Sequence, residues 1–407
     1  MNELLSEKVE QAATVLREQQ IDAWLTFVRE TTESGDPVLP MILGQPLTWQ
    51  SALILTATGR RIAIVGKYED EAVRQTGVWK EVIPYVEGIR TPLREILAEI
   101  DPRRLAINFS PHDVKADGLS HGMYLLLQEY LDGTPYGKRL VSAGTIINRL
   151  RGRKTAGEVT RIRHAIATTD EIFAAVASFA RPGRTETDIA AFMHEQAATR
   201  GVETAWERAM CPIVTTGPGS MVGHGVPSPE LAVRPGHVFH LDFGVRQDDY
   251  CSDLQRAWYV PSPADPEPPA AIHHAFEAIV AAINAAAAML RPGVLGWEVD
   301  EAARTTLTAA GYPSYEHATG HHVGRAAHDG GGVLGPRWER YGRTPYYPVE
   351  AGNVLTLELG VDNVEGRGYL GLEEMLLVTD DGIEWLSTPQ TELRQLGQVG
   401  ERPAGVA

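Results

Sequence analysis

The second half of the chain contains an internal repeat. The segments VRPGHVFHLDFGV (residues 233–245) and VEAGNVLTLELGV (residues 349–361) align without gaps and are identical at six positions. An alanine-rich helical pattern that ends at Arg-Pro-Gly precedes each segment, at 181–183 and at 291–293. Two matches at similar spacing indicate a duplicated half-domain, and we expect its halves to pack about a pseudo-two-fold axis.

The repeat brings carboxylates to equivalent places, because Asp242 aligns with Glu358. Residues 238–243 alternate as a strand does, and residues 250–260 have the pattern of a return strand. This predicts a hairpin with Asp242 and Asp253 on opposite arms, within about 5 Å across the ladder. Two carboxylates that close repel each other unless a cation lies between them. The alternative is that both aspartates are solvated, as charged residues mostly are.

Three further polar residues stand in apolar surroundings downstream. Glu358 lies in VLTLELG, Glu373 lies in LGLEEMLLVT, and His321 lies in HATGHHVGRAAH. A carboxylate inside an apolar strand must be paired or bound to metal, because burying it alone is too costly. Carboxylates with one imidazole suit divalent Mn, Co, Zn or Fe.

The order Asp242, Asp253, His321, Glu358, Glu373 resembles the metallopeptidases of the pita-bread fold, which include methionine aminopeptidase, Xaa-Pro aminopeptidase, prolidase and creatinase. The segment RKTAGEVTRIRHA is similar to the entry into the catalytic domain of the prolidase and Xaa-Pro aminopeptidase branch. The resemblance implies an α+β chain. A smaller α/β creatinase-type domain for substrate capping and dimerisation (residues 1–150) precedes a pita-bread catalytic domain with an internal pseudo-two-fold repeat (residues 151–407).

The resemblance also implies a cofactor of two divalent ions per chain, with Mn²⁺ preferred and Co²⁺ or Zn²⁺ as alternatives. Asp242 would chelate one ion, Asp253 and Glu373 would bridge both, and His321 and Glu358 would complete the second. Such a pair activates a hydroxide as the nucleophile and polarises the scissile carbonyl. Glu358 would also carry the proton from the nucleophile to the leaving nitrogen.

Three other histidines match the family: His224, His317 and His328. The resemblance gives them catalytic roles in holding the substrate and stabilising the tetrahedral intermediate. Each taken alone could be a structural histidine.

The sequence departs from the family pattern at Gly371, where the Xaa-Pro branch typically has an arginine two residues before the final glutamate. Arg367 is the candidate to replace it.

The composition of the chain limits the classes of partner that we expect it to bind. The net charge of −16 is spread along the chain, which argues against nucleic acid or an anionic membrane as a partner. The apolar run at 278–290 is too short to span a bilayer. Two cysteines, outside any CxxC pattern, and an N-terminus without an apolar leader favour a cytoplasmic location.

The expected function is metal-dependent hydrolysis of the Xaa-Pro bond in dipeptides, with small proline-containing peptides as substrates. Alternatives are an Xaa-Pro aminopeptidase acting on longer peptides and, in a different class, a non-catalytic binding module on the same fold. The proline-rich stretch 35–48 predicts a loop. By resemblance this loop would reach the active site of a second subunit, which implies a homodimer.

Overall fold

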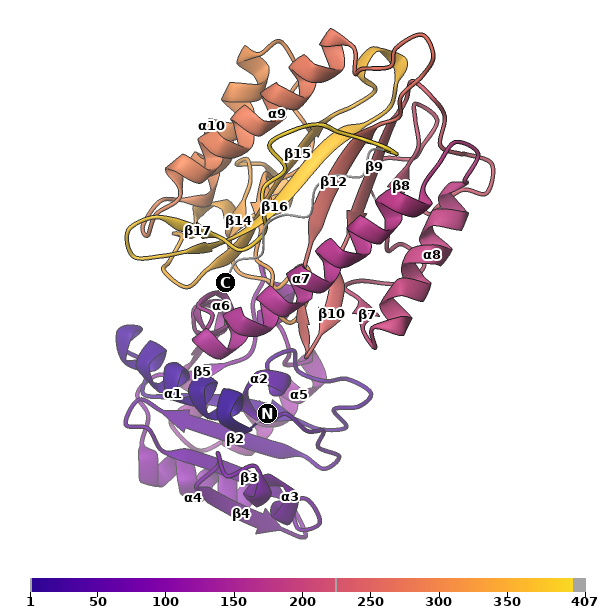
Figure 1. Cartoon of the computed structure of the whole chain (residues 1–407). Coiled ribbons are helices and arrows are strands. Elements are labelled where there is room, and N and C mark those ends of the chain that lie inside the picture. Colours follow the sequence, from indigo (N-terminus) through magenta and orange to yellow (C-terminus); the bar gives the residue numbers. More distant parts are fainter. Residues whose placement is uncertain (1, 224, 398–407) are drawn as a thin grey trace. The chain divides into compact units, whose positions relative to one another are not determined.

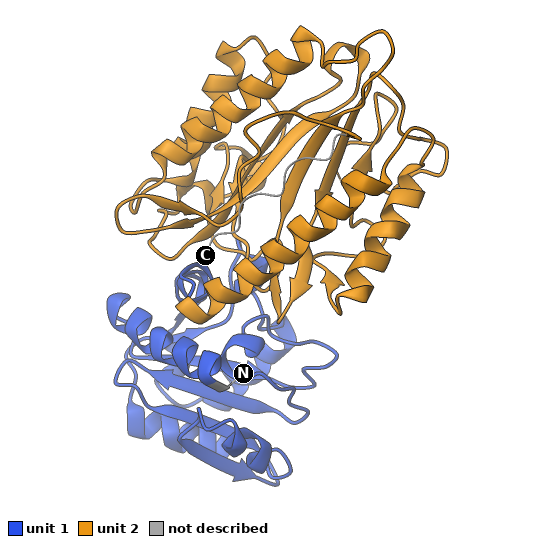
Figure 2. Cartoon of the chain, viewed as in Figure 1, with its two compact units in different colours: residues 1–155 blue, residues 156–407 orange. Residues whose placement is uncertain are grey.

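The chain forms two compact units, residues 1–155 and 156–407 (Figure 2). The structure is a computed structural model and describes residues 2–223 and 225–397. The division falls between Thr155 and Ala156, where a long helix begins, whereas we predicted a boundary after residue 150.

The first unit is built on a mixed sheet of six strands in the order β4-β3-β2-β1-β5-β6 (Figure 1). Nearly every residue of its central strands is buried, because helices cover both faces of the sheet. Strands with two covered faces read as continuous apolar runs. The strands are β1 (Ala23–Val28), β2 (Ser51–Thr56), β3 (Arg61–Gly66), β4 (Glu81–Tyr85), β5 (Leu105–Ile107) and β6 (Leu140–Ser142).

Two apolar clusters lie on the two faces of this sheet. One cluster joins the sheet to α1 (Asn2–Glu18), α2 (Leu39–Ile42) and α6 (Gly144–Gly152). The other joins it to α4 (Arg90–Ile100) and α5 (His121–Leu131). The short helix α3 (Asp70–Gln75) follows β3.

The stretch 35–48 is only partly the loop that we predicted. It contains α2, and Leu39, Met41, Ile42 and Leu47 are buried in the core of the first unit. Pro40, which we took as a loop signal, lies in the first turn of α2, where proline is tolerated because its missing N–H has no partner there.

Four helices of the second unit pack in two pairs, α7 (Ala156–Phe179) with α8 (Glu186–Thr199) and α9 (Ala270–Met289) with α10 (Gly296–Ala309) (Figure 1). By length and composition α9 could cross a membrane, since it begins before the apolar run that we considered. Its buried residues, among them Ile272 and Ile279, pack in the core with β15 and β16. We therefore assign its apolar character to the core.

The main sheet of the second unit runs β15-β16-β12-β9-β8, with β17 beside β16 and β18 beside β12. Smaller sheets are β11-β10-β7 and β13-β14. The strands are β7 (Glu203–Thr204), β8 (Ile213–Thr215), β9 (Val238–Phe243), β10 (Val245–Gln247), β11 (Tyr250–Cys251), β12 (Leu254–Tyr259), β13 (Gly320–His321), β14 (Val333–Leu334), β15 (Val354–Val361), β16 (Leu370–Val378), β17 (Ile383–Trp385) and β18 (Arg394–Gln395).

The two repeat segments form β9 and β15, and each pairs antiparallel with the strand that follows it, β12 or β16. β12 and β16 meet in the middle of the sheet, so the order β15-β16-β12-β9 reads alike from either side of that seam. The pseudo-two-fold axis predicted from the repeat accordingly passes between β12 and β16.

The predicted hairpin is wrong in one respect. The return arm is broken into β11 and β12, and Asp253 lies in the short gap between them. The strand residue directly opposite Asp242 is Gln255. The break arises because β10 leaves the main sheet after Gly244 and pairs with β7 and β11 instead.

Candidate metal centre

Four polar side chains form one row across the main sheet. Glu358 on β15 stands opposite Glu373 on β16, Glu373 opposite Gln255 on β12, and Gln255 opposite Asp242 on β9. Residues directly opposite each other on paired strands lie on the same face. Leu357 and Leu359 flank Glu358 and are part of the core beside α9. The row therefore lies on the face turned away from that helix.

His321 joins this row from the segment beside the edge strand β15. Its backbone N–H donates to Oγ1 of Thr356, and the N–H of Glu358 donates to the carbonyl of Thr319. Gly320 makes this approach possible, because a Cβ there would collide with the carbonyl of Thr356.

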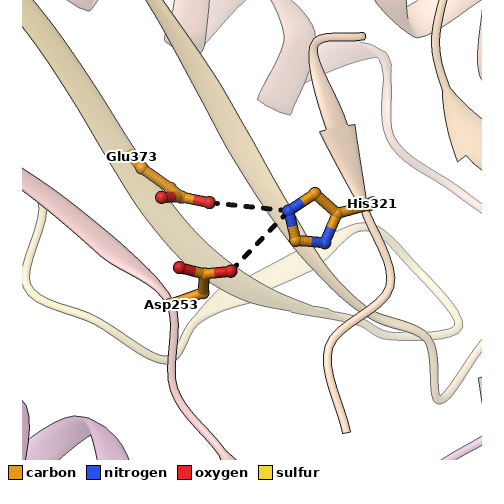
Figure 3. A group of neighbouring side chains, drawn as sticks. All are labelled: Asp253, His321 and Glu373. Carbon is orange, nitrogen blue, oxygen red and sulfur yellow. Dashed lines mark ion pairs between the residues drawn. The ribbon is translucent and has the colours of Figure 1, made fainter. Parts of the chain in front are cut away.

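The side chains of Asp253, His321 and Glu373 converge (Figure 3). Nε2 of His321 lies 3.8 Å from a carboxylate oxygen of Asp253 and 3.8 Å from one of Glu373. It lies 3.5 Å from Oε1 of Glu358. Atoms that bind a shared ion at about 2.1 Å stand roughly 3–3.5 Å apart, so these donor atoms are nearly at ligand spacing.

The tautomer of His321 suits a ligand. Nδ1 of His321 lies 3.3 Å from the carbonyl of His322, which only accepts, so Nδ1 carries the proton and the lone pair on Nε2 faces the carboxylates. Burial, together with nearby His328, lowers the pKa of His321 to about 3 and keeps the ring neutral.

Few hydrogen bonds from the described residues compensate for the burial of these carboxylates. Both side-chain oxygens of Glu373 and Oδ1 of Asp242 are buried without a hydrogen-bond partner there. Burial raises the pKa of Asp242 to about 7 and, with the charge of Asp242, that of Glu358 to about 8. Burial and neighbouring carboxylates hold the pKa values of Asp253 and Glu373 well above their usual range. Orphaned oxygens in a cluster of one sign fit a bound cation.

We expect the metal-free protein to lose stability as pH rises from about 4 to about 8. In this window the folded state holds protons on Asp242 and Glu358 that the unfolded chain, with carboxyl pKa values near 4, has released. The melting temperature in chelator should fall by roughly 5 °C or more between pH 5 and pH 8. Divalent ions should remove the trend, and a rise with pH in chelator, measured relative to the metal-loaded protein, would contradict it.

The three histidines that we predicted to be catalytic lie in different surroundings or outside the described residues. His224 lies outside the described residues. His328 lies beside the centre, with its ring centroid 4.4 Å from that of His321. His317 makes its contacts elsewhere: its Nδ1 donates to the carbonyl of Ala318, and its ring lies near that of Tyr315.

A buried network holds the segment that carries His317 and His321. Arg304 donates to both carboxylate oxygens of Asp300 and to the carbonyl of His317. Thr319 donates from its hydroxyl to Asp300. These bonds fix the backbone on both sides of residue 318, and with it the direction of His321.

Arg367, our candidate to replace the arginine that the Xaa-Pro branch typically has at the position of Gly371, makes its contacts away from the carboxylate row. Its guanidinium pairs with Asp265 at 2.9 Å and donates to the carbonyl of Gly236. A Cβ at Gly371 would lie 2.8 Å from Oε1 of Gln255 and 2.5 Å from Cε1 of Tyr369, so these two side chains fill the space. Our reading of the sequence missed Gln255, although its spacing of two from Asp253 is that of a shared strand face.

The fold and this set of donors define a protein built to hold divalent metal. The chain belongs to metallopeptidase family M24, whose profile matches residues 160–380. This confirms the predicted family, the pita-bread fold and the assignment as a metal-dependent peptidase.

Relatives and solved structures agree with the family. The probable dipeptidase PepE of Mycobacterium bovis is 33% identical over 253 residues, which are 60% of this chain and 60% of that protein. The Xaa-Pro dipeptidase of Pyrococcus furiosus is 28% identical over 249 residues, 61% of this chain and 66% of that protein. The structure of an Xaa-Pro dipeptidase from Bacillus anthracis superimposes with a TM-score of 0.73 at 23% identity, covering 96% of this chain and 100% of that one.

Proposed function

We propose that the protein hydrolyses the Xaa-Pro bond of dipeptides with a pair of divalent ions held by Asp242, Asp253, His321, Glu358 and Glu373. The observation that carries this proposal is the row of carboxylates, in which both oxygens of Glu373 and Oδ1 of Asp242 are buried without a hydrogen-bond partner among the described residues. Four carboxylates and one imidazole exceed the roughly three protein ligands of a single catalytic zinc ion, which favours a pair.

The ions, when bound, would supply an activated water and a Lewis acid for the scissile carbonyl. The side chains supply the rest. Glu358 has one oxygen towards His321 and the other towards Gln255, so it can take a proton at the centre and return it to the leaving nitrogen. His328 lies beside His321 and is exposed, a place from which its ring can donate to a substrate oxygen.

The Xaa-Pro preference is supported by the names of relatives, among them the Xaa-Pro dipeptidase of Pyrococcus furiosus. A bond before proline has no N–H, and the ring fixes φ near −65°, so a dedicated site is needed to hold the ring and protonate the nitrogen. His224 and His317 remain our predicted further donors to the substrate.

Comparing Ala-Pro, Ala-Pro-Ala and Ala-Ala at equal concentration with metal-loaded protein tests the substrate class. We expect Ala-Pro to be cleaved fastest, because a dipeptidase must recognise the free carboxylate close behind the ring. Preference for Ala-Pro-Ala would establish the aminopeptidase alternative instead. Preference for Ala-Ala would refute the Xaa-Pro assignment, and no hydrolysis of any peptide by metal-loaded protein would favour the binding module.

Three further parts of the proposal have their own measurements. Metal analysis of the protein purified without added metal identifies the native ion, for which we propose Mn²⁺. Light scattering tests the proposed homodimer, and fractionation of the source cells tests the proposed cytoplasmic location.

A further inference from the structure

We propose that Gln255 is a positioning residue, which holds Glu358 in the orientation that the metal centre requires and is itself held by His240. This inference rests on the proposed function, since it concerns the same site. The arrangement consists of two hydrogen bonds in series, from His240 to Gln255 and from Gln255 to Glu358.

The direction of both bonds follows from the chemistry of the groups. The ionised carboxylate, which is the form of Glu358 that binds a metal ion, only accepts, so the amide Nε2 of Gln255 must face Oε2 of Glu358, at 3.2 Å. The amide Oε1 then faces Nε2 of His240, at 3.0 Å, and this nitrogen must carry the proton. With Oε2 of Glu358 occupied in this way, Oε1 is the oxygen left to face His321.

The pseudo-two-fold axis shows what is unusual about Gln255. Across the seam between β12 and β16, Gln255 corresponds to Glu373, as Asp242 corresponds to Glu358. The chain thus has an amide at the place where the other half has a carboxylate of the same length. Glutamine reaches as far as glutamate but brings no charge, so it can donate to Glu358 where a fourth carboxylate in the row would repel it.

Packing around the amide leaves it little freedom. The ring of Tyr369 meets that of His240 edge to face, with centroids 4.9 Å apart. A Cβ at Gly360 would collide with Tyr369, and one at Gly371 would collide with both Tyr369 and Gln255. The two glycines therefore make room for Tyr369, and the ring in turn supports His240. A rotamer locked by such neighbours can orient a ligand, whereas a mobile one cannot.

The test is Gln255→Met, which conserves volume and removes both hydrogen bonds. Calorimetric titration of metal-free protein with Mn²⁺ should show one ion bound about 10–100-fold more weakly. The visible absorption spectrum of the Co²⁺ form should change. With Ala-Pro and saturating metal, kcat should fall by a similar factor while KM stays within about twofold, because a positioning residue does not touch the substrate.

Gln390→Met is the matched control. Gln390 is also a buried amide beside β12, where it bonds the backbone of Ala257. This variant should lower the melting temperature and leave Mn²⁺ affinity and the Co²⁺ spectrum unchanged. If Gln255→Met behaves in the same way, its role is structural and the proposal is overturned.

His240→Leu provides a second, independent arm. It should weaken Mn²⁺ binding in the wild-type background and have no further effect in Gln255→Met, because it acts only through the amide. Additive effects of the two substitutions on Mn²⁺ affinity, or no effect of His240→Leu alone, would overturn the proposal that His240 acts on Glu358 through Gln255. The Mn²⁺ titrations involve no peptide, so they decide this inference even if the protein cleaves none of the dipeptides.

Discussion

Asp253→Asn should lose at least one bound ion and reduce hydrolysis of Ala-Pro by roughly 1000-fold or more, because the proposed ions would supply both the nucleophile and the Lewis acid. The side chain of Asp253 is buried, and one of its oxygens lies 3.8 Å from Nε2 of His321. Asparagine has the same shape but no negative charge, so the change removes charge from the cluster without opening a cavity. Metal content by atomic absorption and turnover of Ala-Pro are the measurements.

The matched control is Asp249→Asn. Asp249 lies in the turn between β10 and β11, where it pairs with Arg246 and Arg325. Its φ is 69°, a conformation that asparagine tolerates well. This variant should keep its ions and its activity. A metal-stripped protein that cleaves Ala-Pro at the full rate would contradict the role of the ions altogether.

The family, the fold and the repeat could be predicted because each depends on local pattern. The match between 233–245 and 349–361 places Asp242 and Glu358 in equivalent strands, β9 and β15, and these strands lie one on each side of the central pair β12 and β16 in one sheet. Glu358 and Glu373 stood out because glutamate inside an apolar strand is costly without a partner. The sequence alone was enough to bring these residues into one hypothesis.

The break in the second arm of the hairpin could not be predicted in the same way. Alternation over residues 250–260 indicates a strand, but it does not tell where the strand changes sheet. The change depends on pairing with β7, a two-residue strand at Glu203–Thr204 that has no pattern of its own. For this reason Asp253, and not Gln255, was expected opposite Asp242.

Gln255 was missed for a related reason. A glutamine in a strand gives no signal of its own, because it costs little when it is hydrogen-bonded. Its importance depends on side chains far away in the sequence: Tyr369 fills the space above Gly371, and Glu358 accepts the bond from the amide. Contacts of this kind become visible only when the strands are in register.

Glu358→Gln should reduce kcat for Ala-Pro by about 10²–10⁴-fold, the usual contribution of a positioned general acid or base. Glutamine keeps the length of the side chain but cannot take up the proton. The loss should persist at saturating metal, because it does not arise from an empty site. Steady-state kinetics over a series of Mn²⁺ concentrations measures it.

Measurements at saturating Mn²⁺ distinguish the role of Glu358 as a metal ligand from its role in proton transfer. A ligand that binds less well is compensated by more metal, so full recovery of kcat at high Mn²⁺ would leave Glu358 as a ligand alone. Glu384→Gln is the control for a glutamate-to-glutamine substitution outside the metal centre, since Glu384 pairs with Arg163 and is half exposed. The oxygens of Glu358 lie between His321 on one side and Gln255 on the other. A carboxylate held at both ends can bind an ion through one oxygen while the other exchanges a proton, and we therefore expect kcat to stay low however much metal is added.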